Sequence, residues 1–148
     1  FYDLFSGVGT FSFLCANGVP RVSCVEESPF AVQALAMNRD EKKRNDMDVV
    51  EGRGERIFPG IWQKELAASQ ALVLIDPPRQ GLEKGLVEFL AQRCSAKALI
   101  YVSCDMATLS RDLRILCSGA WKAQRIVPFD MFPRTKHLEI AVLLKPLS

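Results

Sequence analysis

The sequence of 148 residues has only one histidine, and none of its cysteines stand in CxxC spacing. The five cysteines are an odd number and are widely separated, which fits neither a disulfide framework nor a zinc-binding pattern. Such usage is typical of reduced thiols, so we expect a cytoplasmic protein without a metal site.

Long apolar runs and a strong net charge are also missing. No run approaches the roughly 20 apolar residues of a membrane span, and no signal peptide is recognisable, so we expect no membrane partner. The net charge is +2 and the pI is near 8.3, whereas a dedicated nucleic-acid-binding domain is expected above a pI of about 9. An RNA substrate stays possible, because a catalytic domain can leave most phosphate contacts to another domain.

The composition is that of one globular domain. Hydrophobic residues make up 49% and charged residues 24% of the chain, and its length allows a sizeable core. The first residue is Phe1 rather than Met, and the first residues already have the pattern of a strand. We therefore expect this to be a fragment of a longer protein.

Apolar runs alternate with helical patterns along the chain. We predict strands at Phe1–Phe5, Arg21–Glu26, Asp48–Glu51, Ala71–Ile75, Ala98–Val102, Ala123–Pro128 and Leu138–Leu144. We predict helices at Thr10–Ala16, Pro29–Asn38, within Ile57–Ala67, and at Glu83–Arg93 and Met106–Leu116. The charged connector Arg39–Asp46 is expected to be a solvated loop. The alternation predicts an α/β fold with a seven-stranded, doubly wound sheet.

The last two predicted strands are joined only by the segment Phe129–His137. A parallel crossover needs a dozen or more residues, so the last strand should be antiparallel.

A cysteine stands where the fifth predicted strand ends. The apolar run Ala98–Val102 stops at Ser103-Cys104, and an amphipathic segment begins at Met106. In open α/β sheets this edge is where ligands bind. Cys104 is then either a small buried hydrophobe or a nucleophile activated by its position near a helix N-terminus.

A glycine turn follows the first predicted strand. Gly7 and Gly9 allow the backbone to approach a ligand closely. Glu26 ends the next strand, at a separation along the sequence that suits hydrogen bonds to both ribose hydroxyls. The third glycine of the dinucleotide fingerprint would fall at Ser12 and is absent, which favours a mononucleoside-type cofactor over NAD. The alternative is an ordinary tight turn with a surface glutamate.

Two more carboxylates follow or begin strands. Asp76 precedes two prolines that make the segment rigid, so it can accept hydrogen bonds from a cofactor or base, while Arg79 binds phosphate or holds a loop carboxylate. Strand alternation places the apolar even-numbered residues of 138–144 on one face and Glu139 with His137 on the other. Glu139 is either a general base with a pKa raised by desolvation or a salt-bridged side chain, and His137 is expected to make a local structural hydrogen bond.

Five segments carry a family resemblance along the whole chain. They are DLFSGVGTF, VEESPFAVQALAMN, DPPRQGL, YVSCDMATLSRDL and FDMFPRTKHLEIAVLL. The chain resembles the catalytic domain of the S-adenosylmethionine-dependent RNA 5-methyluridine methyltransferases, which have a Rossmann-like class I sheet and modify uridines in ribosomal and transfer RNA. The resemblance implies that Cys104 is the nucleophile and Glu139 the base. It also implies that the cofactor is S-adenosyl-L-methionine, at positions Phe5, Thr10, Glu26 and Asp76 beside the glycine turn.

The chain departs from the family pattern in two ways. Asp105 stands where the family usually has asparagine, and its charge would oppose thiolate formation unless it is paired or protonated. The family's upstream half, often with an N-terminal RNA-binding barrel, is not in this sequence. By the resemblance we expect an RNA substrate, ribosomal rather than transfer RNA, with Arg79, Arg134 and Lys136 on the RNA side.

Two other functions are open alternatives. One is a non-catalytic RNA-binding remnant, motivated by Asp105 and the short chain. The other is a small-molecule methyltransferase, against which the pairing of Cys104 with Glu139 argues, because simple O- or N-methylation needs no covalent cysteine.

Overall fold

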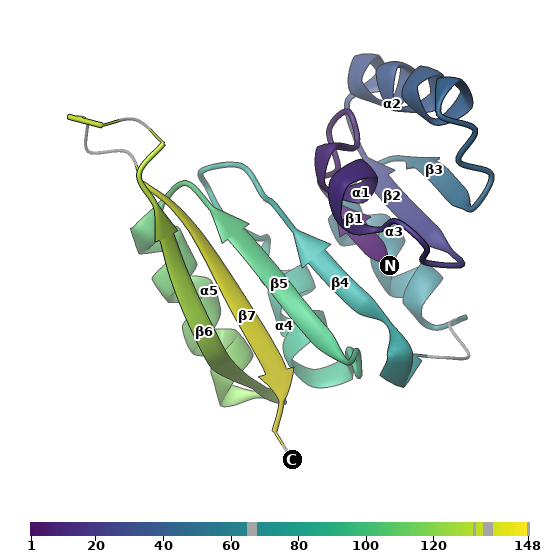
Figure 1. Ribbon diagram of the computed structural model, residues 1–148. Coiled ribbons are helices and arrows are strands. Elements are labelled where there is room, and N and C mark those ends of the chain that lie inside the picture. The colour runs from purple at the N-terminus through teal and green to yellow at the C-terminus, as the bar shows by residue number, and fades with distance from the viewer. Residues whose placement is uncertain (65–67, 132, 135–137, 148) are drawn as a thin grey trace.

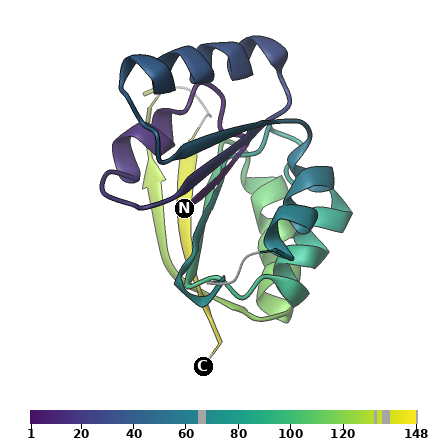
Figure 2. The same ribbon diagram turned by 90° about the vertical axis from the view of Figure 1, so that its right-hand side faces the viewer.

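A seven-stranded sheet with helices on both faces forms the molecule (Figure 1; Figure 2). The structure is a computed structural model, and it describes residues 1–64, 68–131, 133–134 and 138–147. The strand order is β3-β2-β1-β4-β5-β7-β6. This arrangement confirms the predicted α/β class and the doubly wound sheet.

The elements alternate as the sequence predicts, with shifted ends. The strands are β1 (Tyr2–Leu4), β2 (Val22–Glu26), β3 (Met47–Glu51), β4 (Leu72–Ile75), β5 (Ala98–Ser103), β6 (Trp121–Phe129) and β7 (Glu139–Pro146). The helices are α1 (Thr10–Cys15), α2 (Pro29–Glu41), α3 (Gly54–Trp62), the 3-10 turn η1 (Ala68–Gln70), α4 (Lys84–Arg93) and α5 (Met106–Ser118).

The strand order reverses between β1 and β4. Both strands are parallel, with Leu4 beside Ile75, and β5 continues the parallel set with Tyr101 beside Ile75. The chain winds from β1 toward β3 on one side and from β4 toward β5 on the other. Such a reversal opens a crevice at the carboxyl ends of the strands, so the topology points to this edge as the place for a ligand.

The last strand is antiparallel, as predicted, but its place in the sheet was not predicted. β7 lies between β5 and β6 and runs antiparallel to both. The first residue of β7 therefore lies at the edge where β5 ends. The inward alternation of β7 is also confirmed, since Ile140, Val142 and Leu144 are buried while Glu139 is half-buried.

The core lies in two layers. Figure 2 shows α3, α4 and α5 on one face of the sheet and α1 and α2 on the other. The larger cluster joins the sheet to α3–α5 and contains an aromatic group in which Tyr2 meets Phe58 and Trp62 with ring centroids 5.6 Å apart. The smaller cluster contains Leu35 of α2 and Cys24 of β2. Strand β4 is wholly apolar, whereas β1, β2 and β3 carry Asp3, Ser23 and Asp48 among their apolar residues.

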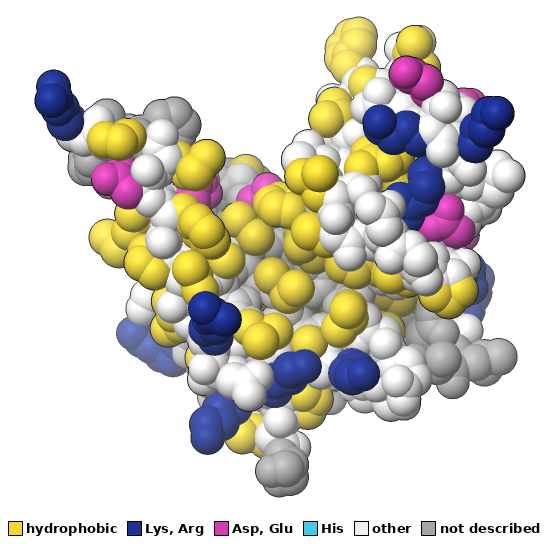
Figure 3. Space-filling view, in the orientation of Figure 1, with side chains coloured by type: hydrophobic (Ala, Val, Ile, Leu, Met, Phe, Trp, Pro, Cys, Tyr) yellow, Lys and Arg dark blue, Asp and Glu magenta, His cyan; other side chains and the backbone are white. Residues whose placement is uncertain are grey.

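The front of β4, β5 and β7 carries no helix of the described chain (Figure 1). Leu99 and Tyr101 belong to the core behind the sheet, so alternation places Ile100 and Val102 of β5 on the front, and both are half-buried. Figure 3 shows hydrophobic side chains gathered in a hollow on this face. The ligand edge of the sheet borders this open hollow.

Two predicted boundaries were wrong. Helix α2 continues through Arg39 to Glu41, because the side chains of residues 39–41 are compatible with a helix. The charged connector is therefore a loop only after Glu41, and the backbone turns at Lys43, which has φ 53°. Helix α3 begins at Gly54, before the predicted range, and includes Pro59 because Phe58 and Trp62 are buried in the core. Residues 65–67 of the predicted range lie outside the described residues.

In the described part of the chain no helix combines the length and the apolar composition that crossing a membrane requires. The same residues hold no group of three or more His, Cys, Asp or Glu side chains placed to bind a metal ion.

Gly119 tests how tightly α5 packs on α4. A Cβ at Gly119 would lie 2.4 Å from the carbonyl oxygen of Ala91. We expect Gly119→Ala to lower the free energy of unfolding by about 1–3 kcal/mol, because backbone must shift to make room. Urea denaturation measures the change. The control is Gly85→Ala in α4, where an added Cβ meets nothing within 4 Å; it should be neutral or slightly stabilising. Equal losses in both variants would contradict the tight packing.

Candidate functional site

The predicted site residues gather along one edge of the sheet. Cys104 follows β5, Asp76 follows β4 and Glu139 begins β7. The pairing of β5 with β7 ends at Ser103 and Ile140, so Cys104 and Glu139 come one residue beyond this pair on neighbouring strands. The antiparallel insertion of β7 thus brings together two residues that are 35 positions apart in the sequence.

The turn that carries Cys104 is braced on both sides. The hydroxyl of Ser103 donates to the backbone oxygen of Asp105 at 3.0 Å and accepts from its N–H at 3.1 Å. Asp105 caps α5, and its Oδ1 accepts the N–H of Thr108 at 2.9 Å. Cys104 itself is half-buried between these groups and is not part of a disulfide. The thiol is therefore held at a fixed, partly accessible place.

The carboxyl of Asp105 is hydrogen-bonded to the first turn of α5. The N–H and hydroxyl of Thr108 hold the pKa of the Asp105 carboxyl below its ordinary value, and Arg79 lowers it further. A carboxylate at a helix N-terminus is also favoured by the helix dipole. Aspartate and asparagine are about equally good N-caps, so the departure from the family pattern preserves the local structure.

Asp76 and Glu139 face the same space. Burial, followed by the charge of Glu139, raises the pKa of Asp76 to about 6. A negative charge close to a carboxyl disfavours the ionisation of that carboxyl. The pair is therefore suited to a ligand that carries positive charge or donates hydrogen bonds.

The glycine turn is hydrogen-bonded to the carboxylate of Glu26. The N–H of Gly7 donates to Oε2 of Glu26 at 2.9 Å, and the N–H of Ser28 donates to Oε1 at 2.8 Å. Each carboxylate oxygen keeps a further acceptor site, so the side chain has a fixed orientation and free capacity for two hydroxyl donors. The structure thus argues against an ordinary solvated surface glutamate.

The other predicted cofactor residues surround this turn. Phe5 has φ 63°, a left-handed conformation that is rare for a non-glycine residue and typical of functional sites. Gly9 has φ 90°, and a Cβ there would lie 2.4 Å from Leu35. Thr10 begins α1 and is exposed, while a Cβ at Gly7 would have nothing within 4 Å. The turn is thus open on the Gly7 side and tightly packed at Gly9.

Asp3 is a buried carboxylate beside the glycine turn, and the sequence analysis did not single it out as a candidate site residue. It is fully buried in β1, and its Oδ2 accepts the hydroxyl of Ser12 at 2.6 Å. Burial raises the pKa of Asp3 to about 6, with smaller contributions from Asp76 and Glu26. A carboxylate within a short apolar strand is costly to bury, and that signal could have found it. Ser12, where a third glycine was looked for, is the partner of Asp3.

Two buried polar atoms at this turn lack a partner among the described residues. They are Oδ1 of Asp3 and Oγ of Ser6. Buried acceptors and hydroxyls normally have a hydrogen-bond partner. A ligand with donor groups would satisfy them.

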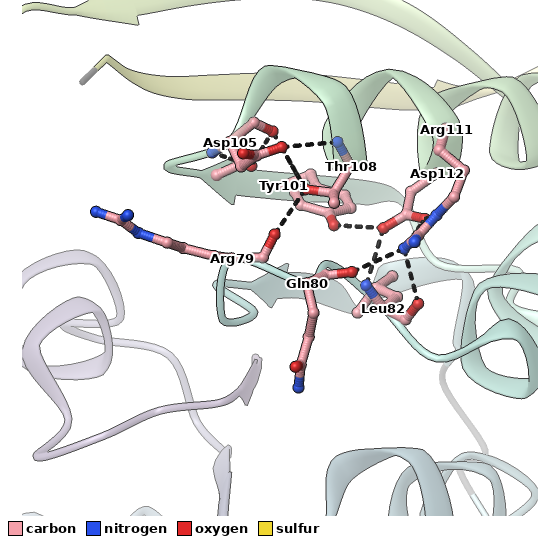
Figure 4. Close-up of polar contacts among 9 residues, drawn as sticks. Arg79, Gln80, Leu82, Tyr101, Asp105, Thr108, Arg111 and Asp112 are labelled. Carbon is pink, nitrogen blue, oxygen red and sulfur yellow. Dashed lines mark hydrogen bonds and ion pairs between the residues drawn. The ribbon is translucent and has the colours of Figure 1, made fainter. Parts of the chain in front are cut away.

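Of the residues expected on the RNA side, the structure describes Arg79 and Arg134. Arg79 and Arg134 are exposed, and the guanidinium of Arg79 points away from α5 (Figure 4). Its backbone oxygen accepts the hydroxyl of Thr108 at 3.0 Å. Lys136 and His137 lie outside the described residues.

Comparison with known proteins decides the family. The model of the tRNA (Uracil-5-)-methyltransferase family matches residues 1–147. The chain belongs to this family. Its members are S-adenosylmethionine-dependent methyltransferases, which confirms the family resemblance.

Relatives of this methyltransferase family extend well beyond the chain. An uncharacterized RNA methyltransferase of Clostridium acetobutylicum is 37% identical over 97% of the chain and 31% of its own length. One of Thermotoga maritima is 37% identical over 96% of the chain and 31% of its own length. The chain thus spans about a third of the curated relatives that it matches.

Solved structures agree with the fold. The tRNA (uracil-54, C5)-methyltransferase of Pyrococcus abyssi, in complex with S-adenosyl-L-homocysteine, superposes with a TM-score of 0.75 at 30% identity, over 97% of this chain and 33% of that one. An rRNA methylase of Streptococcus thermophilus has a TM-score of 0.73 at 11% identity, over 99% of this chain and 86% of that one, and supports the fold alone.

The buried Asp3 predicts a pH dependence of stability. Its carboxyl has a pKa of 3.8 in the reference state and about 6 in the fold. The unfolded chain therefore releases its proton first, and the folded state loses stability as the pH rises from about 4 to about 6. Asp3→Asn should remove a loss on the order of 2 kcal/mol over this range. Urea denaturation at a series of pH values measures the difference. The same pH dependence in wild type and variant would contradict the assignment.

Proposed function

We propose that this chain is the catalytic domain of an RNA methyltransferase that transfers a methyl group to C5 of a uridine through a covalent bond from Cys104 to C6. The observation that carries the proposal is that Cys104 and Glu139 each stand one residue beyond the Ser103–Ile140 pair, at the sheet edge where the glycine turn also follows β1. A thiol and a carboxylate on neighbouring strands supply a nucleophile and a base to opposite ends of the same uracil double bond.

The residues at the edge fit S-adenosyl-L-methionine. Glu26 presents two fixed oxygens for the ribose hydroxyls, and the open space at Gly7 admits a ligand against the backbone. Asp3, Asp76 and Glu139 surround the edge with carboxylates, which suit the sulfonium and ammonium charges of this cofactor. The unpartnered oxygens of Asp3 and Ser6 are candidates for its donor groups. When bound, the cofactor supplies an electrophilic methyl group.

The chemistry explains why a thiol and a carboxylate occur together. C5 of uracil is a weak nucleophile. Attack of the Cys104 thiolate on C6 forms an S–C6 bond and moves the electron pair of the double bond toward C5 and the C4 carbonyl, so C5 becomes enolate-like and takes the methyl group. Glu139 then removes the C5 proton, the double bond re-forms, and the S–C6 bond breaks to release the thiolate.

The proposed substrate is an RNA with an accessible uridine. The base must leave its stack to reach a thiol at the sheet edge, which suits loops and single strands. Ribosomal and transfer RNA both offer such sites, and the Pyrococcus abyssi relative acts on the latter. Mapping 5-methyluridine in a strain that lacks the full-length gene identifies the RNA and the position.

Glu26 tests the cofactor site. We expect Glu26→Ala in the full-length protein to weaken S-adenosylmethionine binding by about 1–3 kcal/mol, because hydrogen bonds to a charged group are lost. Isothermal titration calorimetry measures the affinity. Glu51→Ala is the matched control, since Glu51 ends the neighbouring strand β3 and is exposed. Unchanged affinity in Glu26→Ala would remove Glu26 from the site.

Covalent catalysis is tested with 5-fluorouridine-substituted RNA. A base can remove the proton at C5 but cannot remove a fluorine there. The full-length enzyme with S-adenosylmethionine should therefore form a methylated covalent adduct that survives a denaturing gel. Cys104→Ala should abolish both adduct and turnover. Cys117→Ala is the control, because Cys117 is an exposed cysteine farther along α5.

Glu139→Gln separates the base from the nucleophile. Loss of general-base help costs about 10²–10⁴-fold, so this variant should accumulate a covalent complex even with ordinary uridine RNA. If the wild-type enzyme forms no adduct with any cellular RNA, the covalent mechanism is wrong and the non-catalytic alternative gains support.

A further inference from the structure

A buried carboxylate on α5 holds the segment that follows Asp76. Asp112 is fully buried, and its Oδ2 accepts the N–H of Leu82 at 2.9 Å and the phenol of Tyr101 at 2.7 Å. Burial, together with the carboxylate of Asp112, raises the pKa of the Tyr101 phenol, which therefore stays a donor. Asp112 thus ties this segment to both α5 and β5.

Arg111 completes the attachment from the surface. Its Nε donates to Oδ1 of Asp112 at 2.9 Å, and its Nη2 donates to the backbone oxygens of Gln80 at 3.0 Å and Leu82 at 3.1 Å. The hydroxyl of Thr108, one turn earlier on α5, donates to the oxygen of Arg79. Figure 4 shows these contacts joining α5 to backbone groups of Arg79, Gln80 and Leu82.

Gly81 lies directly against this network. A Cβ at Gly81 would lie 2.7 Å from Nη2 of Arg111 and 2.7 Å from Oδ2 of Asp112, and the backbone has φ +72°. No side chain larger than hydrogen fits there without displacing the two charged groups. Residues 79–82 therefore pack directly against Arg111 and Asp112.

The attachment fixes the backbone from which the Arg79 side chain projects. The hydrogen bonds between this segment and α5 use backbone atoms of residues 79–82, while the guanidinium of Arg79 points away from the helix (Figure 4). The same helix starts two residues after Cys104. The position of the Arg79 side chain is thus coupled to the position of the thiol through one rigid element.

We propose that Asp112 is a positioning residue of the RNA-binding edge, which fixes residues 79–82 on α5 so that Arg79 meets an RNA phosphate beside Cys104. This inference rests on the proposed function, because it takes RNA as the ligand of Arg79. Asp112 lies behind the sheet and has no direct contact with RNA in this proposal. Its effect passes through the Leu82 N–H and through Arg111.

Amide hydrogen exchange on the full-length protein without RNA tests the structural half. Asp112→Asn removes the charge that holds Arg111, so the Leu82 amide should exchange about tenfold faster. Tyr101→Phe is the matched control. It removes the hydrogen bond from the phenol to Asp112 but leaves the hydrogen bonds of Asp112 with the Leu82 N–H and with Arg111. Arg111→Lys is a second variant with less risk to folding: it keeps the charge and loses the planar fork, and it should accelerate the same amide.

Binding to a synthetic RNA hairpin with uridines in its loop tests the functional half. Arg79→Gln should weaken binding about tenfold in the wild-type background and by much less in the Asp112→Asn background, since residues that act as a unit are not additive. An Arg79→Gln effect of the same size in both backgrounds, or equal Leu82 exchange in Asp112→Asn and Tyr101→Phe, overturns the positioning role.

The two proposals fail in different ways. If Arg79→Gln leaves hairpin affinity unchanged, there is nothing for Asp112 to position, yet a wild-type adduct with 5-fluorouridine RNA would still support the proposed function. If the adduct is absent while the coupling of Arg79 and Asp112 is present, the positioning role stands without the covalent mechanism.

Discussion

The antiparallel backbone pairing of β5 with β7 is the constraint on which the site depends. Parallel strands bring only their carboxyl ends to the ligand edge, whereas an antiparallel strand brings its first residue there. The pairing of Ser103 with Ile140 therefore sets Glu139 next in line to Cys104. A shift of one residue in this register would turn Glu139 to the opposite face and bury it in the core. The alternation of buried Ile140, Val142 and Leu144 opposes such a shift.

Several carboxyl groups lie around this edge of the sheet, and their surroundings differ. Asp3 and Asp76 are carboxyls whose pKa is raised by burial, and Glu139 and Glu26 contribute to the same field. Asp105 differs, because a helix N-terminus and Thr108 hold its charge. The carboxylates on or after β1, β2, β4 and β7 thus give this edge a negative field, which favours a cationic cofactor.

Helix α5 connects the parts of the site that come from different strands. Its first turn is capped by Asp105, directly after Cys104, and its next turns hold residues 79–82 through Thr108, Arg111 and Asp112. A charge as deeply buried as Asp112 is costly unless it is paired and hydrogen-bonded. Both of its oxygens have partners, one of them the guanidinium of Arg111. A fully satisfied network of this kind rigidifies the elements that it joins.

The sequence by itself determined the alternation of strands and helices, the doubly wound sheet and the places of Cys104, Glu26 and Asp76 at strand ends. These features follow from local patterns: apolar runs, glycine turns and prolines act within a few residues. The family membership was also readable, because several motifs occur in order along the chain.

Only the tertiary structure decided which strand ends meet. The insertion of β7 between β5 and β6, the burial of Asp3 against Ser12 and the network around Asp112 join residues far apart in the chain. Local pattern carries no information on such pairings, since the free energy that selects them comes from packing and from satisfying buried polar groups over the whole domain. Helix α3 is the converse case, where burial of Phe58 and Trp62 holds Pro59 inside a helix against its propensity.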